Sequence, residues 1–197
     1  MSEKVEFIIA HHLHRRYKIV SQISSIVVQT NPNWNIHVVC DGVDTDIEFL
    51  KNVFPESEFP NIRYSILEKS HNDWGHTPRN YGVNNCKANW LVMCGNDNYY
   101  IPIFVDEMLK VIDSNPKINF LYCDMIHNHY GYNLFKCVPK LNRIDMCNMV
   151  VKTELAKQLP LNTKIYAADG IFCEQYVEKF CKEENIHYFP HIYYVHN

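Results

Sequence analysis

The sequence has no apolar run that approaches the ~20 residues needed to cross a bilayer, so it predicts no membrane span. It begins Met-Ser-Glu-Lys and passes directly into a β-rich run, so no signal peptide is predicted. Lysine and arginine (19) nearly balance aspartate and glutamate (22), which gives a formal net charge of −3. This near-neutral charge predicts neither a nucleic-acid partner nor binding to an anionic membrane surface.

The cysteines and histidines show no zinc-binding pattern. None of the eight cysteines forms a Cys-x-x-Cys pair, and several, such as Cys40 and Cys94, lie inside apolar segments. This distribution favours buried, reduced thiols over a disulfide framework, and it predicts a cytoplasmic location. The eleven histidines include His-x-His pairs at residues 12–14 and 127–129, but neither pair has a third ligand at a suitable spacing.

The order of apolar segments predicts an α/β protein. β-rich or apolar runs alternate with helical spacing, which indicates a Rossmann-like, mostly parallel sheet flanked by helices. The predicted strands cover residues 5–10, 36–40, 62–67, 90–94, 118–123, 149–151 and 186–195. The predicted helices cover residues 16–29, 46–54, 103–112, 153–159 and 167–181, and a further helix begins near residue 77. A length of 197 residues fits one domain.

The helix that begins near residue 77 has clear local signals. Thr77 is placed to accept from the free N–H groups of a new helix, and Pro78 suits the first turn. Gly82 has no side chain, so it allows close packing on the helix face that it shares with Pro78 and Arg79. Arg79, close to a helix N-terminus, suggests a bound phosphate.

The strand at residues 90–94 is apolar throughout and ends abruptly at Gly95-Asn96-Asp97-Asn98. An apolar run of this kind is typical of a strand covered on both faces of a parallel sheet. Ligands of open α/β sheets bind outside the carboxyl ends of the strands. The single carboxylate at this tip, Asp97, therefore suggests a metal ion beside the phosphate.

Four blocks of sequence follow one another in a fixed order. They are Ser25-Ile26-Val27-Val28-Gln29-Thr30, Val38-Val39-Cys40-Asp41-Gly42, Gly75 through Gly82, and Gly95-Asn96-Asp97. In order and spacing they resemble the blocks of family 2 glycosyltransferases, which have the nucleotide-sugar-binding GT-A fold. Downstream, Ala168-Asp169 resembles the family's Glu-Asp acceptor-side motif, and His196 resembles its late metal-contacting histidine.

The resemblance implies a metal-dependent, inverting hexosyl- or deoxyhexosyltransferase. It implies one domain over 1–197, with a nucleotide-sugar-binding half (1–110) and an acceptor-binding half (111–197). The donor would be a UDP- or GDP-sugar, and the acceptor a glycan or glycoprotein. The implied donor-binding residues are Ala10, His11, His12, Asp41, Arg79, Asn96 and Asp97. Asp97 and His196 would hold Mn²⁺ or Mg²⁺, and Asp169 would act as the general base.

The sequence departs from the family pattern at two positions. Gly95 stands where the metal motif usually has its first aspartate, which removes one carboxylate from the expected metal site. Ala168 stands where glutamate is common, although Asp169 remains. These departures keep open a second interpretation, that of a catalytically impaired nucleotide-sugar-binding relic.

Simpler roles are open for the residues named above. Asp97 and Asp41 each adjoin residues typical of turns and could be turn residues. His196 could lie in a frayed terminus, and His11 and His12 could be solvated.

Arg79 and Asp169 have competing structural roles. A cation in the first turn of a helix opposes the helix dipole, so Arg79 calls for an anionic partner. It could instead be a surface residue or pair with a nearby acid. Asp169 precedes Gly170 at a predicted helix start, where aspartate is a favoured N-cap. Capping would lower the basicity of Asp169, so the two roles compete for the same oxygens.

Two further interpretations concern a loop and the overall activity. Residues 127–133 combine tyrosine, histidine and asparagine, which suit either sugar binding or a mobile surface loop. A sugar-nucleotide-forming nucleotidyltransferase would need a glycine-rich phosphate loop after the first strand, and here that loop is histidine-rich. A metal-dependent hydrolase that uses the histidines is another alternative, and it would turn over its substrate without a nucleotide sugar.

Overall fold

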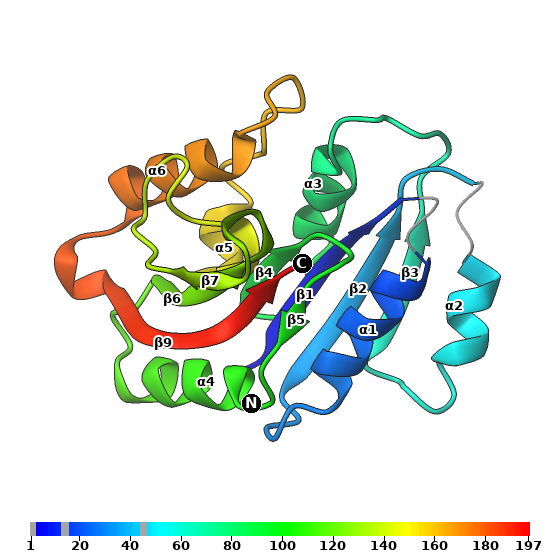
Figure 1. The fold of residues 1–197 in the computed structure, drawn as a ribbon, viewed down its shortest axis with the longest axis horizontal. Helices are drawn as coiled ribbons and strands as arrows, with labels where there is room; N and C mark the ends of the chain where they lie inside the picture. The colour runs from blue at the N-terminus through cyan, green and yellow to red at the C-terminus, as the bar shows by residue number, and fades with distance from the viewer. Residues whose placement is uncertain (1–2, 13–15, 44–46) are drawn as a thin grey trace.

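Figure 1 shows a computed structural model of the protein, which describes residues 3–12, 16–43 and 47–197. The strands are β1 (Val5–His11), β2 (Trp34–Cys40), β3 (Ile62–Ile66), β4 (Trp90–Cys94), β5 (Tyr99–Tyr100), β6 (Phe120–His127), β7 (Asn133–Phe135), β8 (Met149–Lys152) and β9 (Ile186–His196). The helices are α1 (Arg16–Val27), α2 (Ile47–Val53), α3 (His76–Asn84), α4 (Phe104–Ser114), α5 (Thr153–Ala156) and α6 (Ala168–Phe180). Each predicted strand and helix has a counterpart; β4 has the predicted bounds and the others have shifted ends. The expected helix start at residue 46 lies outside the described residues.

One mixed sheet runs through the molecule, in the order β3-β2-β1-β4-β8-β6-β9-β5, with β7 paired to β6. The first four strands are parallel, as predicted from the alternation of strands and helices. β8 runs antiparallel to both β4 and β6, and β9 returns parallel to β6. The predicted α/β class is confirmed, and the parallel order is concentrated in the N-terminal half.

The central strand β1 is buried along its whole length and is covered on both faces. Successive side chains of a strand point to opposite faces, so Phe7 and Ile8 face different layers. The Phe7 ring lies 5.0 Å from Tyr100 and 5.9 Å from Phe104 at the start of α4. On the other face, Ile8 packs against Gly82 of α3. The sheet is therefore the middle of three layers, which explains the apolar runs in its strands.

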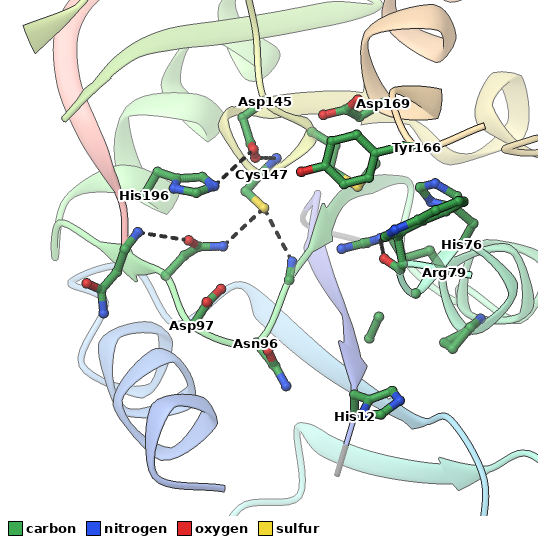
Figure 2. A pocket seen from close by; sticks show the side chains of 18 of the residues that line it. His12, His76, Arg79, Asn96, Asp97, Asp145, Cys147, Tyr166, Asp169 and His196 are labelled. Carbon is green, nitrogen blue, oxygen red and sulfur yellow. Dashed lines mark hydrogen bonds and ion pairs between the residues drawn. The ribbon is translucent and has the colours of Figure 1, made fainter. Parts of the chain in front are cut away.

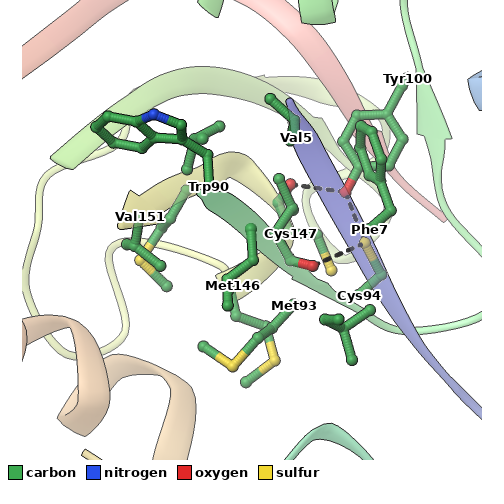
Figure 3. Packing of buried hydrophobic residues seen from close by; sticks show 14 of the residues in the cluster. Val5, Phe7, Trp90, Met93, Cys94, Tyr100, Met146, Cys147 and Val151 are labelled. Atoms are coloured by element: carbon green, nitrogen blue, oxygen red, sulfur yellow. Dashed lines mark hydrogen bonds between the residues drawn. The ribbon is translucent and has the colours of Figure 1, made fainter. Parts of the chain in front are cut away.

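The core also joins the two halves of the chain. Figure 3 shows Tyr100 beside β1, with its hydroxyl directed toward Cys94 and Cys147. This hydroxyl donates to the Cys147 carbonyl (2.8 Å) and lies 3.1 Å from Cys94 Sγ. Tyr100 is completely buried. The segment that follows β4 is thereby fixed against the segment that precedes β8.

A polar cluster lies within the parallel strands, at the end of α3. The buried carboxylate of Glu6 pairs with Arg63 and accepts from the Lys87 N–H (3.1 Å). Arg63 also donates to the Asn85 carbonyl at the C-terminal end of α3 (2.8 Å) and lies 3.2 Å from His37. Burial, with Arg63 nearby, lowers the pKa of His37 to about 3, so this imidazole stays neutral. The cluster links β1, β2 and β3 to α3.

The N-terminus of α3 is capped differently from the sequence prediction. Gly75 precedes the helix with φ of 84°, a conformation that suits glycine, and Thr77 lies inside the first turn. The Asp73 carboxylate accepts from the Thr77 N–H (2.9 Å) and from its hydroxyl. The prediction that Thr77 is the cap is therefore wrong, because the longer reach of Asp73 satisfies the same donors. Pro78 lies in the first turn as predicted.

In the C-terminal half, β9 brings the end of the chain back to the centre. Figure 1 shows this strand curving along β6 so that the C-terminus lies in the middle of the view. Its register sets His196 opposite His127. Residues 127–133, predicted to lack regular structure, span the end of β6, a 3₁₀ turn (Asn128–Tyr130) and the start of β7. His196 is thus held in a sheet, which argues against a frayed terminus.

The cysteines of the described chain are free, and seven of them are buried, with Cys181 half-buried. This confirms the prediction of buried thiols in place of a disulfide framework. No helix within the described ranges is both long enough and apolar enough for a membrane crossing.

We expect Gly82→Ala to destabilise the protein. A Cβ at this position would lie 2.1 Å from Cγ2 of Ile8, and such overpacking typically costs about 1–3 kcal/mol. Urea unfolding followed by circular dichroism would measure the change. Asn84→Ala, on an exposed position of the same helix, is the matched control and should change stability by no more than about 0.5 kcal/mol. Equal stability of the two variants would contradict the described packing of α3.

Candidate functional site

A cavity of about 760 Å³ opens at the carboxyl ends of β1 and β4 and receives residues from both halves of the chain. Its lining includes every site residue that the sequence singled out, namely Ala10, His11, His12, Asp41, Arg79, Asn96, Asp97, Asp169 and His196. Segments as far apart as β1, the loop before α3, the turn after β4, residues 142–147, the start of α6 and the end of β9 meet here (Figure 2). The topology, rather than proximity in sequence, brings these side chains together.

The turn after β4 is held by the two amides that flank Asp97. Asn96 is buried, and its amide lies 3.2 Å from Nδ1 of His11. Asn98 is also buried, accepts from the Asn197 N–H (3.3 Å) and donates to Cys147 Sγ (3.4 Å). The amides thus serve the structure of the turn, and the carboxylate of Asp97 is the group that the turn presents to the cavity.

Asp97 lies beside a cation that the sequence did not indicate. Lys18, on α1, places its Nζ 3.6 Å from Oδ2 of Asp97, and both residues line the cavity. The Lys18 side chain is half exposed, whereas that of Asp97 is only 13% exposed. Because the Lys18 side chain is half exposed, water weakens this ion pair from one side.

His196 is oriented by its neighbours. Its ring stacks on that of His127, with centroids 4.2 Å apart and planes at 7°. Nδ1 lies 3.0 Å from Oδ1 of Asn128, which can only accept, so this nitrogen carries the proton. In the neutral imidazole the lone pair is then on Nε2, which lies 3.6 Å from Oδ2 of Asp145. This nitrogen can bind a metal ion when the imidazole is neutral, and it forms an ion pair with Asp145 when the imidazole is protonated.

The described residues include no group of three or more histidine, cysteine, aspartate or glutamate side chains placed to hold a metal. Asp97 and His196 are oxygen and nitrogen donors in the same cavity, and Figure 2 shows them on the side opposite His76 and Arg79. Two donors of this kind fit a divalent cation only if a ligand such as a diphosphate supplies the remaining oxygens.

Arg79 is buried at the wall of the cavity. Its Nε donates to the Cys94 carbonyl and its Nη1 to the Trp74 carbonyl, each at 2.9 Å. No carboxylate of the described residues pairs with it, so the alternative of an ion pair with a nearby acid is not observed. Since both of these partners are neutral, the positive charge remains available to an anion in the cavity.

Asp41 is fully engaged by the loop at residues 70–72. Its oxygens accept from the His71 and Asn72 N–H groups at 3.0–3.3 Å and from the Ser70 hydroxyl at 3.1 Å. The His71 ring nitrogen lies 3.0 Å away. Asp41 therefore positions this loop at the cavity, and a direct contact with a nucleotide remains a prediction.

Asp169 lies in the first turn of α6, but it does not cap the helix. The N-cap is Ala167, without a side-chain hydrogen bond, so the prediction that Asp169 is the N-cap is wrong. Hydrogen bonds from the backbone at Gly170 and Asp169 still act on the carboxylate and lower its pKa, so the predicted competition with its basicity is present in weaker form. Burial raises the pKa of Asp169, and the negative charge of Asp145 adds to this effect. The raised pKa makes this carboxylate a stronger proton acceptor than an ordinary aspartate.

Sequence reasoning missed several residues that line the cavity, among them Lys18, Trp74, His76, Asp145, Cys147 and Tyr166. Lys18 lies on the polar side of a helix that was identified by its apolar residues alone. Asp145 and Cys147 belong to a segment without a recognisable period. Only the return of β8 and β9 to the sheet brings that segment to the cavity.

Comparison with known proteins supplies a family. The family model "Glycosyl transferase family 2" matches residues 15–149, more than half of the chain. A curated relative from Haemophilus influenzae, described as an uncharacterized glycosyltransferase, is 26% identical over 129 residues, or 64% of this chain and 42% of that protein.

Solved structures confirm the predicted GT-A fold. Staphylococcus aureus TarS (residues 1–349) matches with a TM-score of 0.79 at 17% identity, over 98% of this chain and 60% of its own. That protein has also been solved with UDP and with UDP-GlcNAc. The mannosyltransferase PcManGT from Pyrobaculum calidifontis, in complex with GDP-Man and Mn²⁺, matches with a TM-score of 0.70 at 14% identity, over 99% and 57%. The chain thus spans less than two thirds of each of these relatives.

We expect Asp169→Asn to raise the free energy of unfolding at neutral pH. The raised pKa means that ionised Asp169 destabilises the folded state, and asparagine carries no charge. The gain should vanish as the pH falls below the ordinary aspartate value of 3.8, where the carboxyl is protonated in both folded and unfolded states. Urea unfolding across pH tests this, with the exposed Glu58→Gln as control. A loss of stability at neutral pH would contradict the prediction.

Proposed function

Because the chain belongs to glycosyl transferase family 2, we propose that it transfers a glycosyl group from a nucleoside-diphosphate sugar to an acceptor hydroxyl. The observation that carries this proposal is the convergence of Arg79, Asp97, Asp169 and His196 on one cavity at the carboxyl ends of β1 and β4. These residues supply a cation, two carboxylates and an imidazole. Such a set suits the departure of a diphosphate and the activation of a hydroxyl group.

The donor's diphosphate would lie between Arg79 and Lys18. Arg79 has its charge unpaired with any carboxylate of the described chain, and Lys18 contacts Asp97 at 3.6 Å. A leaving diphosphate gains negative charge as the glycosidic bond breaks, so fixed cations stabilise its departure. The nucleoside would extend toward Ala10, His12 and the loop that Asp41 holds.

A divalent cation, Mn²⁺ or Mg²⁺, would be held by Asp97 and by Nε2 of His196, with the donor's phosphate oxygens completing its shell. When bound, such an ion neutralises charge on the leaving diphosphate. The imidazole ligand favours Mn²⁺. The Mn²⁺ in PcManGT supports this assignment, as does the tautomer that Asn128 selects in His196.

Asp169 would act as the general base. As the acceptor oxygen bonds to the anomeric carbon, the acceptor's proton passes to the carboxylate of Asp169. The bond from the anomeric carbon to the diphosphate oxygen breaks, and its electron pair leaves with the diphosphate. Attack from the face opposite the leaving group inverts the anomeric configuration. The raised pKa of Asp169 supports this role, because it increases the affinity of the carboxylate for a proton.

The donor is proposed to be a UDP- or GDP-hexose or deoxyhexose, and the acceptor a glycan or glycoprotein. The two base classes correspond to the UDP-GlcNAc bound to TarS and the GDP-Man bound to PcManGT. Titration of UDP-GlcNAc and GDP-Man with Mn²⁺, followed by measurement of released UDP or GDP, tests the proposal. Stabilisation by a nucleotide sugar without release, even with glycan acceptors, would favour the relic suggested by Gly95 and Ala168.

Asp97→Ala should abolish the Mn²⁺-dependent part of donor binding, because it removes the one carboxylate that the turn after β4 presents to the cavity. Calorimetric titration of UDP or GDP with and without Mn²⁺ measures this part directly. Asp113→Asn, an exposed residue of α4, is the control and should bind as wild type does. If Asp97→Ala keeps its Mn²⁺ dependence, the metal is held elsewhere.

Asp169→Asn should bind the donor normally but transfer it about 10²- to 10⁴-fold more slowly, the range expected for loss of a general base. Steady-state kinetics with the active donor, together with titration of the nucleotide, separates the two effects. Transfer at the wild-type rate would remove Asp169 from the mechanism. A parallel loss of donor binding would point to a structural role instead.

A further inference from the structure

Two exposed aromatic rings lie at the cavity, one from each half of the chain. Trp74 precedes α3 and is 53% exposed, and Tyr166 precedes α6 and is 73% exposed. Their ring centroids lie 5.6 Å apart with planes at 76°. Among the described residues that line the cavity, they are the only tryptophan, tyrosine or phenylalanine side chains. Figure 2 shows the Tyr166 ring next to Asp169, with its hydroxyl turned toward the open pocket.

The backbone at Trp74 is strained. Its φ of 59° lies in the left-handed region, which bulky residues rarely adopt. Such strain persists only where the surroundings impose it, and it is concentrated at functional sites. Here Asp41 accepts from the N–H groups of His71 and Asn72, and Nη1 of Arg79 donates to the Trp74 carbonyl at 2.9 Å. The indole ring is therefore kept at the cavity at a cost in conformational energy.

His76 connects the two aromatic residues. Its Nε2 lies 3.1 Å from the Ile165 carbonyl, and its ring centroid lies 5.9 Å from that of Trp74. Burial, with the charge of Arg79 nearby, lowers the pKa of His76, so a neutral imidazole donates this hydrogen bond. The segment that carries Tyr166 is thereby tied to the segment that carries Trp74. The pair is formed before any ligand binds.

The other aromatic segment, at residues 127–133, offers no comparable surface to the cavity. Tyr130 packs on Phe135 with centroids 5.1 Å apart, and Tyr132 donates from its hydroxyl to Asn197 at 2.7 Å. Neither tyrosine lines the cavity. That segment contributes Asn128 and His129 to the lining, so Trp74 and Tyr166 are the only tryptophan or tyrosine residues of the two groups that line the cavity.

We propose that Trp74 and Tyr166 form the stacking platform for the pyranose ring of the acceptor, an inference that rests on the proposed transferase function. A pyranose presents a rigid face of C–H groups that packs on an aromatic ring, with hydroxyls at its edge. Tyr166 lies three residues before Asp169, the group that would take the acceptor's proton. The backbone carbonyl of Trp74 accepts from Arg79, so the platform adjoins the side of the cavity where the diphosphate is proposed to lie. A flexible polyol has no such face and would gain little.

Fluorescence quenching reports on this platform directly. Trp34 and Trp90 are only 7% and 3% exposed, so acrylamide reaches Trp74 selectively. With UDP or GDP and Mn²⁺ present, the methyl pyranosides of glucose, galactose, mannose and N-acetylglucosamine are titrated in turn. We expect at least one to protect Trp74 from quenching, whereas ribitol and glycerol should not. Protection by none of the pyranosides, or equal protection by the polyols, would overturn the proposal.

Variants separate stacking from folding. Trp74→Asn removes the ring at a left-handed position that asparagine tolerates, so its melting temperature should not fall. Its affinity for the protecting pyranoside, measured by calorimetry, should fall roughly tenfold, as should that of Tyr166→Ala. Tyr166→Phe should bind within about twofold of wild type. Tyr81→Ala, an exposed tyrosine of α3 outside the cavity lining, is the matched control and should bind normally.

A further measurement distinguishes acceptor from donor. Release of UDP or GDP from UDP-GlcNAc or GDP-Man without acceptor should have the same KM in Trp74→Asn as in wild type. A raised donor KM with an unchanged acceptor affinity would overturn the assignment to the acceptor. If no nucleotide binds but pyranosides still protect Trp74, the transferase proposal fails while the sugar platform stands. If nucleotides bind and pyranosides do not protect Trp74, the sugar-platform proposal fails while the transferase proposal stands.

Discussion

The site depends on a buried guanidinium that holds two pieces of backbone together. Arg79 donates to the last carbonyl of β4 and to the carbonyl before α3, both at 2.9 Å. The first bond fixes the strand end from which Asp97 projects, and the second fixes the strained residue Trp74. Both hydrogen bonds go to neutral carbonyls, so the guanidinium that joins these two backbone segments keeps its positive charge. A diphosphate bound in the cavity would meet this charge. In the proposed function, Arg79 would therefore both hold the backbone and recognise the donor.

The second half of the chain completes this wall by returning to the sheet. β8 and β9 flank β6, one antiparallel and one parallel to it. The segment before β8, the start of α6 and the end of β9 bring Asp145, Asp169 and His196 to a cavity begun by the parallel strands. Burial raises the pKa of Asp169, and the charge of Asp145 adds to this effect. A proton acceptor of increased basicity thus arises from two residues that are remote in sequence, and its formation requires the whole fold.

The sequence was most informative where a local pattern had one physical cause. The apolar run at 90–94 and its polar end predicted both a buried strand and the turn that presents Asp97. Predictions failed where two residues could do the same task, as with Asp73 and Thr77 at the start of α3. Lys18, Asp145 and Tyr166 could not be identified from the sequence as cavity residues, because their place at the cavity depends on segments distant in the chain. The strain at Trp74 could not be predicted either, since it reflects contacts of the surrounding loop rather than the residue itself.

The cluster of Glu6, Arg63 and His37 bears on how the chain folds. Side chains alternate between the two faces of a strand, so sliding β1 by one residue would turn the Glu6 carboxylate into the apolar layer that Phe7 occupies. No cation would meet it there, and an isolated charge in such surroundings is strongly disfavoured. The buried charge of Glu6 therefore disfavours any register of β1 that is shifted by one residue. With this register, β1, β2 and β3 end level and β4 ends opposite Ile9, so the cavity lined by functional groups forms where the strands stop.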